Sequence, residues 1–150
     1  MRLIDTRIEI ATSPMRVWSV LTDFARFPEW NPFIVRIEGT LEPGARLRVQ
    51  IKPPGKSAMT FTPTILVARP AKEFRWRGRL LLPGIFDGEH AFELESRGDG
   101  CSFRQSERFT GLLVPLLGGA LAATQRGFEA MNAALKRRAE AESSLSHKKL

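Results

Sequence analysis

The chain has 150 residues, a single cysteine and a formal net charge of +7, which suits one domain with a sizeable hydrophobic core. The lone cysteine excludes an intramolecular disulfide, and no apolar run reaches the roughly eighteen residues of a membrane-spanning helix. Residues 1–7 carry charges where a signal peptide needs an apolar stretch, so we expect a cytoplasmic protein without stable membrane insertion.

The positive charge is dispersed along the chain. Arginine and lysine occur at many separate positions, often within a few residues of a carboxylate, and the tightest cluster is Lys136, Arg137 and Arg138. Cations at that position complement the dipole of the helix that we expect to end there. A nucleic-acid interface needs a concentrated basic patch, so we predict no nucleic-acid partner.

The N-terminal part of the chain predicts one strand and two short helices. Residues 3–10 alternate apolar and polar side chains, as in a half-buried strand. A hydroxyl residue followed by Pro14 begins a helix over residues 15–21. A second helical turn over residues 24–27 ends at Pro28, and the segment 28–32 is irregular.

From Phe33 onward the sequence predicts an antiparallel meander. Glycine and proline punctuate this part of the chain at short intervals, which is typical of hairpin turns. The expected strands are 33–38, 46–52, 57–67, 73–80, 85–95 and 101–109. Together with residues 3–10 they make seven strands.

The last third predicts one long amphipathic helix over residues 114–140. Apolar side chains recur there at steps of three and four residues and share one face: Leu117, Leu121, Thr124, Phe128, Met131 and Leu135. We expect Gly118 and Gly119 to make a bend or a close-packing point in this helix. Residues 143–150 are polar, and we expect a frayed, disordered tail.

These elements predict an α+β fold in a single domain over residues 1–142. A lone long helix must bury its apolar face, and the only partner that the chain offers is the sheet. We therefore expect a seven-stranded curved antiparallel sheet wrapped round the C-terminal helix, with two short helices after the first strand. A curved sheet over a helix favours a hollow between the two layers.

Several local motifs give the chain a resemblance to a known family. They are residues 10–14 (IATSP), 17–18 (VW), 21–23 (LTD), 27–32 (FPEWNP), 88–92 (GEHAF) and 106–113 (SERFTGLL). In these motifs and their layout the chain resembles the START-like SRPBCC superfamily, which includes polyketide cyclase/dehydrase and lipid-transport proteins. The resemblance covers residues 2–140 and implies the helix-grip fold, with a deep and mostly apolar cavity.

The resemblance implies less about activity, because one scaffold serves binders, transporters, cyclases and co-regulators. The first hypothesis is binding of a small hydrophobic ligand, such as a lipid, a polyketide or another aromatic molecule. The second is a cyclase/dehydrase-type enzyme that works without metal or cofactor. The third is an interaction or stress-type domain with a small cavity. The sequence leaves open whether the protein is a monomer or a homodimer.

Strand alternation predicts which side chains face the cavity. In residues 86–94 and 101–109 the inward set is aromatic and aliphatic except for three polar residues, His90, Gln105 and Glu107. With the expected mouth and the helix stripe added, the ligand-binding candidates are Trp30, Phe61, Phe74, Trp76, His90, Phe92, Phe103, Gln105, Glu107, Leu121, Thr124 and Phe128.

His90 and Glu107 are the catalytic candidates. A buried histidine beside a buried carboxylate can transfer protons near neutral pH. Alternatively, these groups orient a polar part of the ligand, or they hydrogen-bond within the sheet and hold its register. Cys101 has no histidine partner in the sequence, and two distant histidines give no metal-ligand spacing, so we expect neither a cysteine nucleophile nor a metal site.

The entrance to the cavity is expected near residues 30–33 and the apolar loop 80–85. Asn31 either meets a ligand or caps the backbone of its turn. The loop either covers the entrance as a lid, faces a membrane or a partner, or folds onto the core. On the outer face of the sheet, Arg75, Arg77 and Arg79 are expected to pair across strands with Glu89, Glu93 and Glu95.

Overall fold

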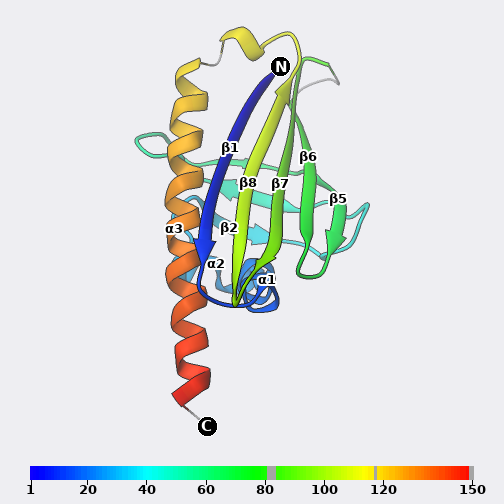
Figure 1. Ribbon diagram of the computed structural model, residues 1–150. Helices are drawn as coiled ribbons and strands as arrows, with labels where there is room; N and C mark the ends of the chain where they lie inside the picture. Colours follow the sequence, from blue (N-terminus) through cyan, green and yellow to red (C-terminus); the bar gives the residue numbers. More distant parts are fainter. Residues whose placement is uncertain (81–83, 117, 149–150) are drawn as a thin grey trace.

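The computed structural model describes residues 1–80, 84–116 and 118–148, with the backbone alone for residues 80 and 142–148. The main sheet has five strands, and Figure 1 shows a long helix along one edge of it and a smaller sheet behind. In chain order the elements are β1 (Arg2–Ile10), α1 (Pro14–Thr22), the 3-10 turn η1 (Phe24–Arg26), α2 (Phe27–Trp30), β2 (Ile34–Glu38), β3 (Arg48–Ile51), β4 (Met59–Phe61), β5 (Thr64–Arg69), β6 (Glu73–Leu80), β7 (Phe86–Arg97), β8 (Gly100–Thr110), the 3-10 turn η2 (Val114–Leu116) and α3 (Gly118–Lys148).

Two antiparallel sheets make up the β part of this α+β helix-grip fold. The main sheet has the order β1-β8-β7-β6-β5, and the small sheet has the order β2-β3-β4. The sequence predicted one sheet of seven strands, and the difference arises because the expected strand 57–67 divides into β4 and β5. Pro63 lies at the division. Proline has no N–H for a ladder hydrogen bond, so pairing breaks there and the chain passes from one sheet to the other.

The helix α3 buries the C-terminal half of the apolar stripe that the sequence predicted, whereas Leu121 and Thr124 are half-buried and Leu117 lies outside the described residues. Phe128, Met131 and Leu135 are fully buried, and the helix packs mainly against β1 and α1. Its start differs from the prediction, because residues 114–116 form η2 and α3 begins at Gly118. The helix then continues to Lys148, so most of the segment expected as a frayed tail is helical. Among the described helices, none is long and apolar enough to cross a membrane.

The main sheet has two distinct ends. We call the end where β1 begins and β8 ends the upper end, and the opposite end the lower end (Figure 1). The helix α1 covers the lower end, and its start follows the expected pattern: Ser13 Oγ accepts a hydrogen bond from the Arg16 amide at 3.2 Å, and Pro14 is the first helical residue. The buried side chains of Val17 and Leu21 add α1 to the core.

The close-packing point on α3 lies at Gly127. A Cβ atom on Gly118 or Gly119 would meet no atom of the described residues within 4 Å, so the prediction of close packing at this glycine pair is wrong for the described part of the chain. A Cβ atom on Gly127 would lie 2.4 Å from Cδ2 of Phe33. The ring of Phe33 is buried and also contacts the ring of Phe128 edge-on, with centroids 5.5 Å apart. Gly127 therefore lets the small-sheet side of the molecule approach the helix backbone.

Replacing Gly127 by alanine should lower the free energy of unfolding by about 1–3 kcal/mol, because the added methyl group overlaps the buried Phe33 ring. The usual effect of this change inside a helix is a gain of up to about 1 kcal/mol. Gly119→Ala is the matched control, and we expect it to leave stability unchanged or to raise it. Urea denaturation midpoints measure both effects, and equal stabilisation by the two substitutions would contradict the close approach at Gly127.

Charged residues cover the outer face of the main sheet as cross-strand pairs. Glu89 accepts hydrogen bonds from Arg75 at 3.0 Å and from Arg77 at 3.4 Å, as the sequence predicted. The Arg79 guanidinium lies 3.7 Å from the Asp87 carboxylate, a pair that was not predicted from the sequence. Opposite charges on neighbouring strands stabilise a solvated face.

A second group of charges lies lower on the same face. Arg104 donates to Asp5 at 2.8 Å and to Glu93 at 3.1 Å, and its hydrogen bond lowers the pKa of the Asp5 carboxyl. Glu95 lies 3.8 Å from Arg97 on its own strand, which corrects the expected pairing across the sheet. The basic residues of this face are thus largely neutralised by neighbouring carboxylates.

Candidate functional site

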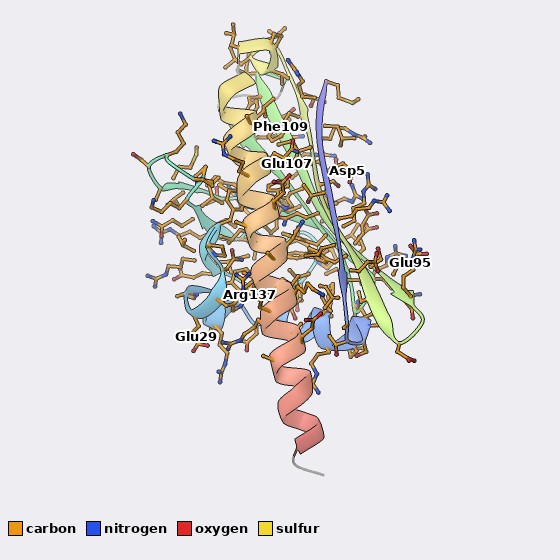
Figure 2. All side chains as sticks on the ribbon, turned by 60° about the vertical axis from the view of Figure 1, so that its left-hand side comes forward. Asp5, Glu29, Glu95, Glu107, Phe109 and Arg137 are labelled. Atoms are coloured by element: carbon orange, nitrogen blue, oxygen red, sulfur yellow. The ribbon has the colours of Figure 1, made fainter. Side chains whose placement is uncertain are left out.

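The inner face of the main sheet carries a row of polar groups near its middle. Trp76 lies opposite His90 in the strand ladder, and His90 lies opposite Glu107. Strand alternation turns these side chains to the same face. Figure 2 shows Glu107 and Phe109 beside the upper half of α3, whereas Asp5 and Glu95 lie away from the helix.

A chain of hydrogen bonds continues from His90 through the core to α3. His90 Nε2 lies 2.9 Å from Gln105 Oε1, and Gln105 Nε2 donates to Asn132 Oδ1 at 2.7 Å. Asn132 Nδ2 donates to Thr6 Oγ1 at 2.8 Å, and that hydroxyl donates to the carbonyl oxygen of Gln105 at 2.8 Å. All four residues are buried. The chain joins β7, β8, β1 and α3 through polar groups that satisfy one another inside the core.

Sequence reasoning did not single out Thr6 or Asn132. Thr6 stands on the inward side of β1 between Ile4 and Ile8, and Asn132 stands one turn after Phe128 on the buried face of α3. Each is a polar residue inside an apolar periodic pattern, and that interruption is the signal that could have identified it. The partner of each residue depends on how the helix sits on the sheet, which no local pattern specifies.

The donor and acceptor directions along these hydrogen bonds determine which ring nitrogen of His90 carries a proton. Since Gln105 gives its amide N–H to Asn132, its oxygen accepts, and the proton of that bond belongs to His90 Nε2. The other ring nitrogen, Nδ1, lies 3.4 Å from Glu107 Oε2. Two unprotonated atoms at this distance repel, so the pair is satisfied when one proton lies between them, on the imidazole or on the carboxyl. This arrangement can deliver a proton to a bound molecule or accept one from it.

Aromatic rings surround His90 on three sides. Its ring centroid lies 4.8 Å from Trp76, 4.4 Å from Phe92 and 4.8 Å from Phe128. These contacts fix the position of the imidazole, with Nδ1 toward Glu107 and Nε2 toward Gln105.

Next to His90, aromatic side chains fill the space where the sequence predicted a wide cavity. The five predicted lining residues that fill it are each at most 1% exposed: Phe74, Trp76, Phe92, Phe103 and Phe128. A side chain that lines a cavity large enough for water keeps accessible surface there, so no such space adjoins these rings. The sequence predicted that these residues contact a ligand, whereas in the structure they pack against one another. Aromatic side chains of this size interdigitate between sheet and helix. Gln105 and His90 are buried among them.

The predicted residues that keep partial exposure on the inner side lie nearer the upper end. The side chain of Glu107 is 16% exposed, and Phe61, Leu121 and Thr124 are half-buried. Thr124 Oγ1 donates to the Ala120 carbonyl within its own helix. These partly exposed residues can therefore contact a small molecule directly, whereas the fully buried residues of the predicted set cannot.

Two glycines make room in the same region. Gly78 and Gly88 lie opposite each other on β6 and β7. A Cβ atom on Gly78 would lie 3.5 Å from the Phe61 ring, and one on Gly88 would lie 2.6 Å from Glu107 Oε1. The absence of side chains at this pair lets the ring and the carboxylate lie against the sheet.

The described parts of the two segments expected at the cavity mouth lie apart. Trp30 ends α2 and residues 31–33 follow it in the lower half of the molecule, whereas Gly84 and Ile85 lie at the upper end, before β7 (Figure 1). Asn31 caps the backbone, because its Oδ1 accepts from the amides of Phe33 at 3.0 Å and Ile34 at 2.9 Å. Trp30 is half-buried and its ring contacts Phe27. Residues 81–83 of the predicted loop lie outside the described residues.

Two concavities of the described surface lie on the outer face of the main sheet. Their volumes are about 680 Å³, between Arg7, Glu93 and Arg104, and about 290 Å³, between Arg77, Arg79 and Arg108. Neither lining includes His90, Gln105 or Glu107.

The described residues show neither a cluster of metal ligands nor an activated cysteine. No three His, Cys, Asp or Glu side chains within 1–80, 84–116 and 118–148 gather closely enough to hold a metal ion. The Cys101 thiol is buried, its pKa is raised by that burial, and it donates to the Ser102 carbonyl oxygen. A thiol in this environment is a poor nucleophile.

Solved structures with the same fold come from several sources. A crystal structure of the Zhui aromatase/cyclase from a Streptomyces strain is similar with a TM-score of 0.74 and 17% identity, covering 93% of both chains. The protein TTHA0849 from Thermus thermophilus is similar with a TM-score of 0.72 and 18% identity, covering 95% of this chain and 99% of that one. The di-domain ARO/CYC BexL gives a TM-score of 0.72 and 17% identity, covering 93% of this chain and 47% of the longer one. At these identities the similarity shows the fold alone.

Comparison with sequences identifies the family. No curated protein matches the chain. A family model described as polyketide cyclase / dehydrase and lipid transport matches residues 1–140, which is nearly the whole chain. The matched segment contains the residues of the hydrogen-bond chain from His90 to Thr6, and Glu107 beside it. The protein therefore belongs to the polyketide cyclase / dehydrase and lipid transport family.

Proposed function

We propose that the protein binds a small hydrophobic molecule with a hydroxyl or keto group between the upper half of α3 and the inner face of the main sheet. The observation that carries the proposal is the position of Glu107. Its partly exposed carboxylate lies among apolar side chains and is backed by His90, which is buried. A few polar groups in an apolar surrounding are the usual composition of a small-molecule site.

The upper inner face supplies the apolar part of the site. Phe61 and Phe86 on the strands and Leu121 on the helix are packed against the core but keep some accessible surface. Leu121 lies about two helical turns nearer the upper end than Phe128, beyond the packed aromatic rings. A flat or elongated apolar molecule would gain most by covering these partly exposed side chains.

Glu107 supplies the polar contact of the proposed site, because its carboxylate would accept a hydrogen bond from a ligand hydroxyl. Trp76 Nε1 lies on the same row and has no hydrogen-bond partner among the described residues. The rings packed around it leave no room for a ligand oxygen, so it takes no part in the proposed contact.

Two probes of nearly equal shape test the proposal: 2-naphthol, which carries a hydroxyl, and 2-methylnaphthalene, which does not. We expect the wild-type protein to bind one equivalent of 2-naphthol about tenfold more tightly, because a hydrogen bond to a carboxylate contributes about 1.5–3 kcal/mol. Glu107→Gln should remove most of this preference and leave the affinity for 2-methylnaphthalene unchanged. Titration calorimetry measures both affinities.

The control for position is Glu95→Gln, which changes a carboxylate on the outer face and should leave both affinities unchanged. Absence of binding by either probe would refute an apolar site, and an unchanged preference in Glu107→Gln would refute the role of that carboxylate. Native mass spectrometry of protein purified from its own source would then identify the natural ligand.

A second candidate function is acid/base catalysis of a cyclisation or dehydration. The separation of 3.4 Å between His90 Nδ1 and Glu107 Oε2 favours it, because one shared proton can be given to a substrate oxygen and taken back. Removing such a group typically lowers turnover by about a hundredfold or more. In the binding function, Glu107→Gln changes affinity alone; in the catalytic function, it lowers kcat with little change in KM.

A further inference from the structure

Two leucines project into solvent at the upper end of the molecule. Leu112 is 77% exposed and Leu116 is 79% exposed, both in the segment between β8 and α3. Figure 1 shows this segment, with η2, at the extreme upper end beside the N-terminus. Exposed apolar residues that gather in one place, unlike single scattered ones, mark a candidate contact surface for a membrane or a partner.

The segment is held in place by the neighbouring loop. The amides of Leu112 and Leu113 donate to the carbonyl oxygens of Gly84 at 3.2 Å and Ile85 at 3.1 Å. Gly111 has a φ of +123°, and a Cβ atom there would lie 2.4 Å from the Ile85 oxygen. Only glycine fits this crossing. The turn that carries Leu112 is therefore fixed by hydrogen bonds and by Gly111, and it holds this leucine at a defined position on the surface.

Charge is distributed unevenly around this turn. No charged residue occurs between Arg108 and Arg126 in the sequence. In the ladder, Arg2 lies opposite the inward-facing Phe109, and Arg108 lies opposite Leu3, which is itself exposed. Because side chains alternate between faces, Arg2 flanks the turn on the inner side of the sheet and Arg108 flanks it on the outer side. Both arginines are exposed, and within the described part of the chain no carboxylate pairs with either of them. The cross-strand neighbour of Arg108 on the other side, Glu89, already accepts from Arg75 and Arg77.

We propose that this surface, defined by Leu3, Leu112, Leu116, Arg2 and Arg108 and called the leucine tip, docks onto an anionic lipid bilayer. Leucine side chains would enter the boundary between head groups and acyl chains, and the two arginines would meet lipid phosphates and carboxylates. A projecting apolar turn flanked by cations fits a soft, negatively charged phase. The protein's net charge of +7 adds a long-range attraction to the same phase.

The docking is independent of the proposed ligand, although both concern the upper half of the molecule. The partly exposed inner residues Phe86 and Leu121 belong to the same half as the leucine tip. A molecule dissolved in the bilayer would therefore meet the protein at the end where its inner face is least covered. Vesicles without any added ligand test the docking, so its failure and the failure of the ligand site are separate results.

The experiment is flotation with vesicles of phosphatidylcholine, with and without phosphatidylserine. We expect the wild-type protein to float with the anionic vesicles and to bind less as salt is raised. Leu112→Ser and Leu116→Ser should each lower the partition coefficient about tenfold, because each loses the burial of one leucine side chain. Arg2→Ala and Arg108→Ala should each lower it about fivefold, and only on the anionic vesicles.

Met59→Ser is the matched control. Met59 is 52% exposed on β4 of the small sheet. Its substitution removes an exposed apolar side chain away from the leucine tip and should leave flotation unchanged. Circular dichroism melting curves establish that each variant remains folded. The proposal is overturned if the wild-type protein fails to float with anionic vesicles at low salt, or if the leucine variants float as well as the wild type. A dimer in light scattering that both leucine variants convert to a monomer, without vesicle binding, would assign the leucine tip to a second copy of the chain.

Discussion

Replacing Phe128 by alanine should lower the free energy of unfolding by about 3–5 kcal/mol, because the change removes a fully buried aromatic side chain and leaves a cavity. The ring of Phe128 contacts Phe33 from the small-sheet side, with centroids 5.5 Å apart, and His90 from the main sheet, with centroids 4.8 Å apart. The helix α3, the small-sheet side and the main sheet meet at this ring, so they cannot fill the vacated space unless α3 moves. Chemical denaturation monitored by tryptophan fluorescence measures the loss.

The control for this substitution is Leu116→Ala, which removes an exposed apolar side chain and should change the free energy of unfolding by no more than about 0.5 kcal/mol. Phe128→Leu should fall between the two. A denaturation midpoint that is unchanged in Phe128→Ala would mean that α3 does not bury its stripe against the sheet, and it would remove the basis of the helix-grip arrangement.

Replacing Gln105 by leucine should destabilise the protein by about 2–4 kcal/mol. The side chain of Gln105 accepts from His90 and donates to Asn132, so an apolar residue of similar size leaves two buried polar groups without partners. Each such group costs about 1–3 kcal/mol. The loss is larger than that of an ordinary hydrogen bond, because water cannot replace Gln105 at a site without accessible surface.

A double-mutant cycle distinguishes this mechanism from a packing defect. Asn132→Leu removes one of the groups that Gln105→Leu orphans, so the double variant should be less destabilised than the sum of the single variants. Gln125→Leu is the matched control on the exposed side of α3 and should change stability little. Strict additivity of the two buried substitutions would show that the hydrogen-bond chain does not act as a unit.

The catalytic hypothesis and the binding hypothesis share their central residues. His90 and Glu107 stand in one cross-strand pair, and the alternation of β7 and β8 was enough to predict that both face inward. The distance of 3.4 Å between them could not be predicted, because side-chain rotamers and local twist decide it. The extent of the binding space could not be predicted either, since it depends on how deeply large rings from facing layers interdigitate.

Local periodicity determined the elements of this protein. A two-residue period in 86–94 and 101–109, and steps of three and four residues from Leu121 to Leu135, depend only on the geometry of strand and helix, so the inward faces followed from the sequence. Tertiary structure alone decided three further features: the passage between sheets at Pro63, the meeting of Thr6 with Asn132, and the filled space around His90. Each depends on the relative placement of segments far apart in the chain. That placement is set by close packing, such as the Phe33 ring against Gly127, and no short-range pattern encodes it.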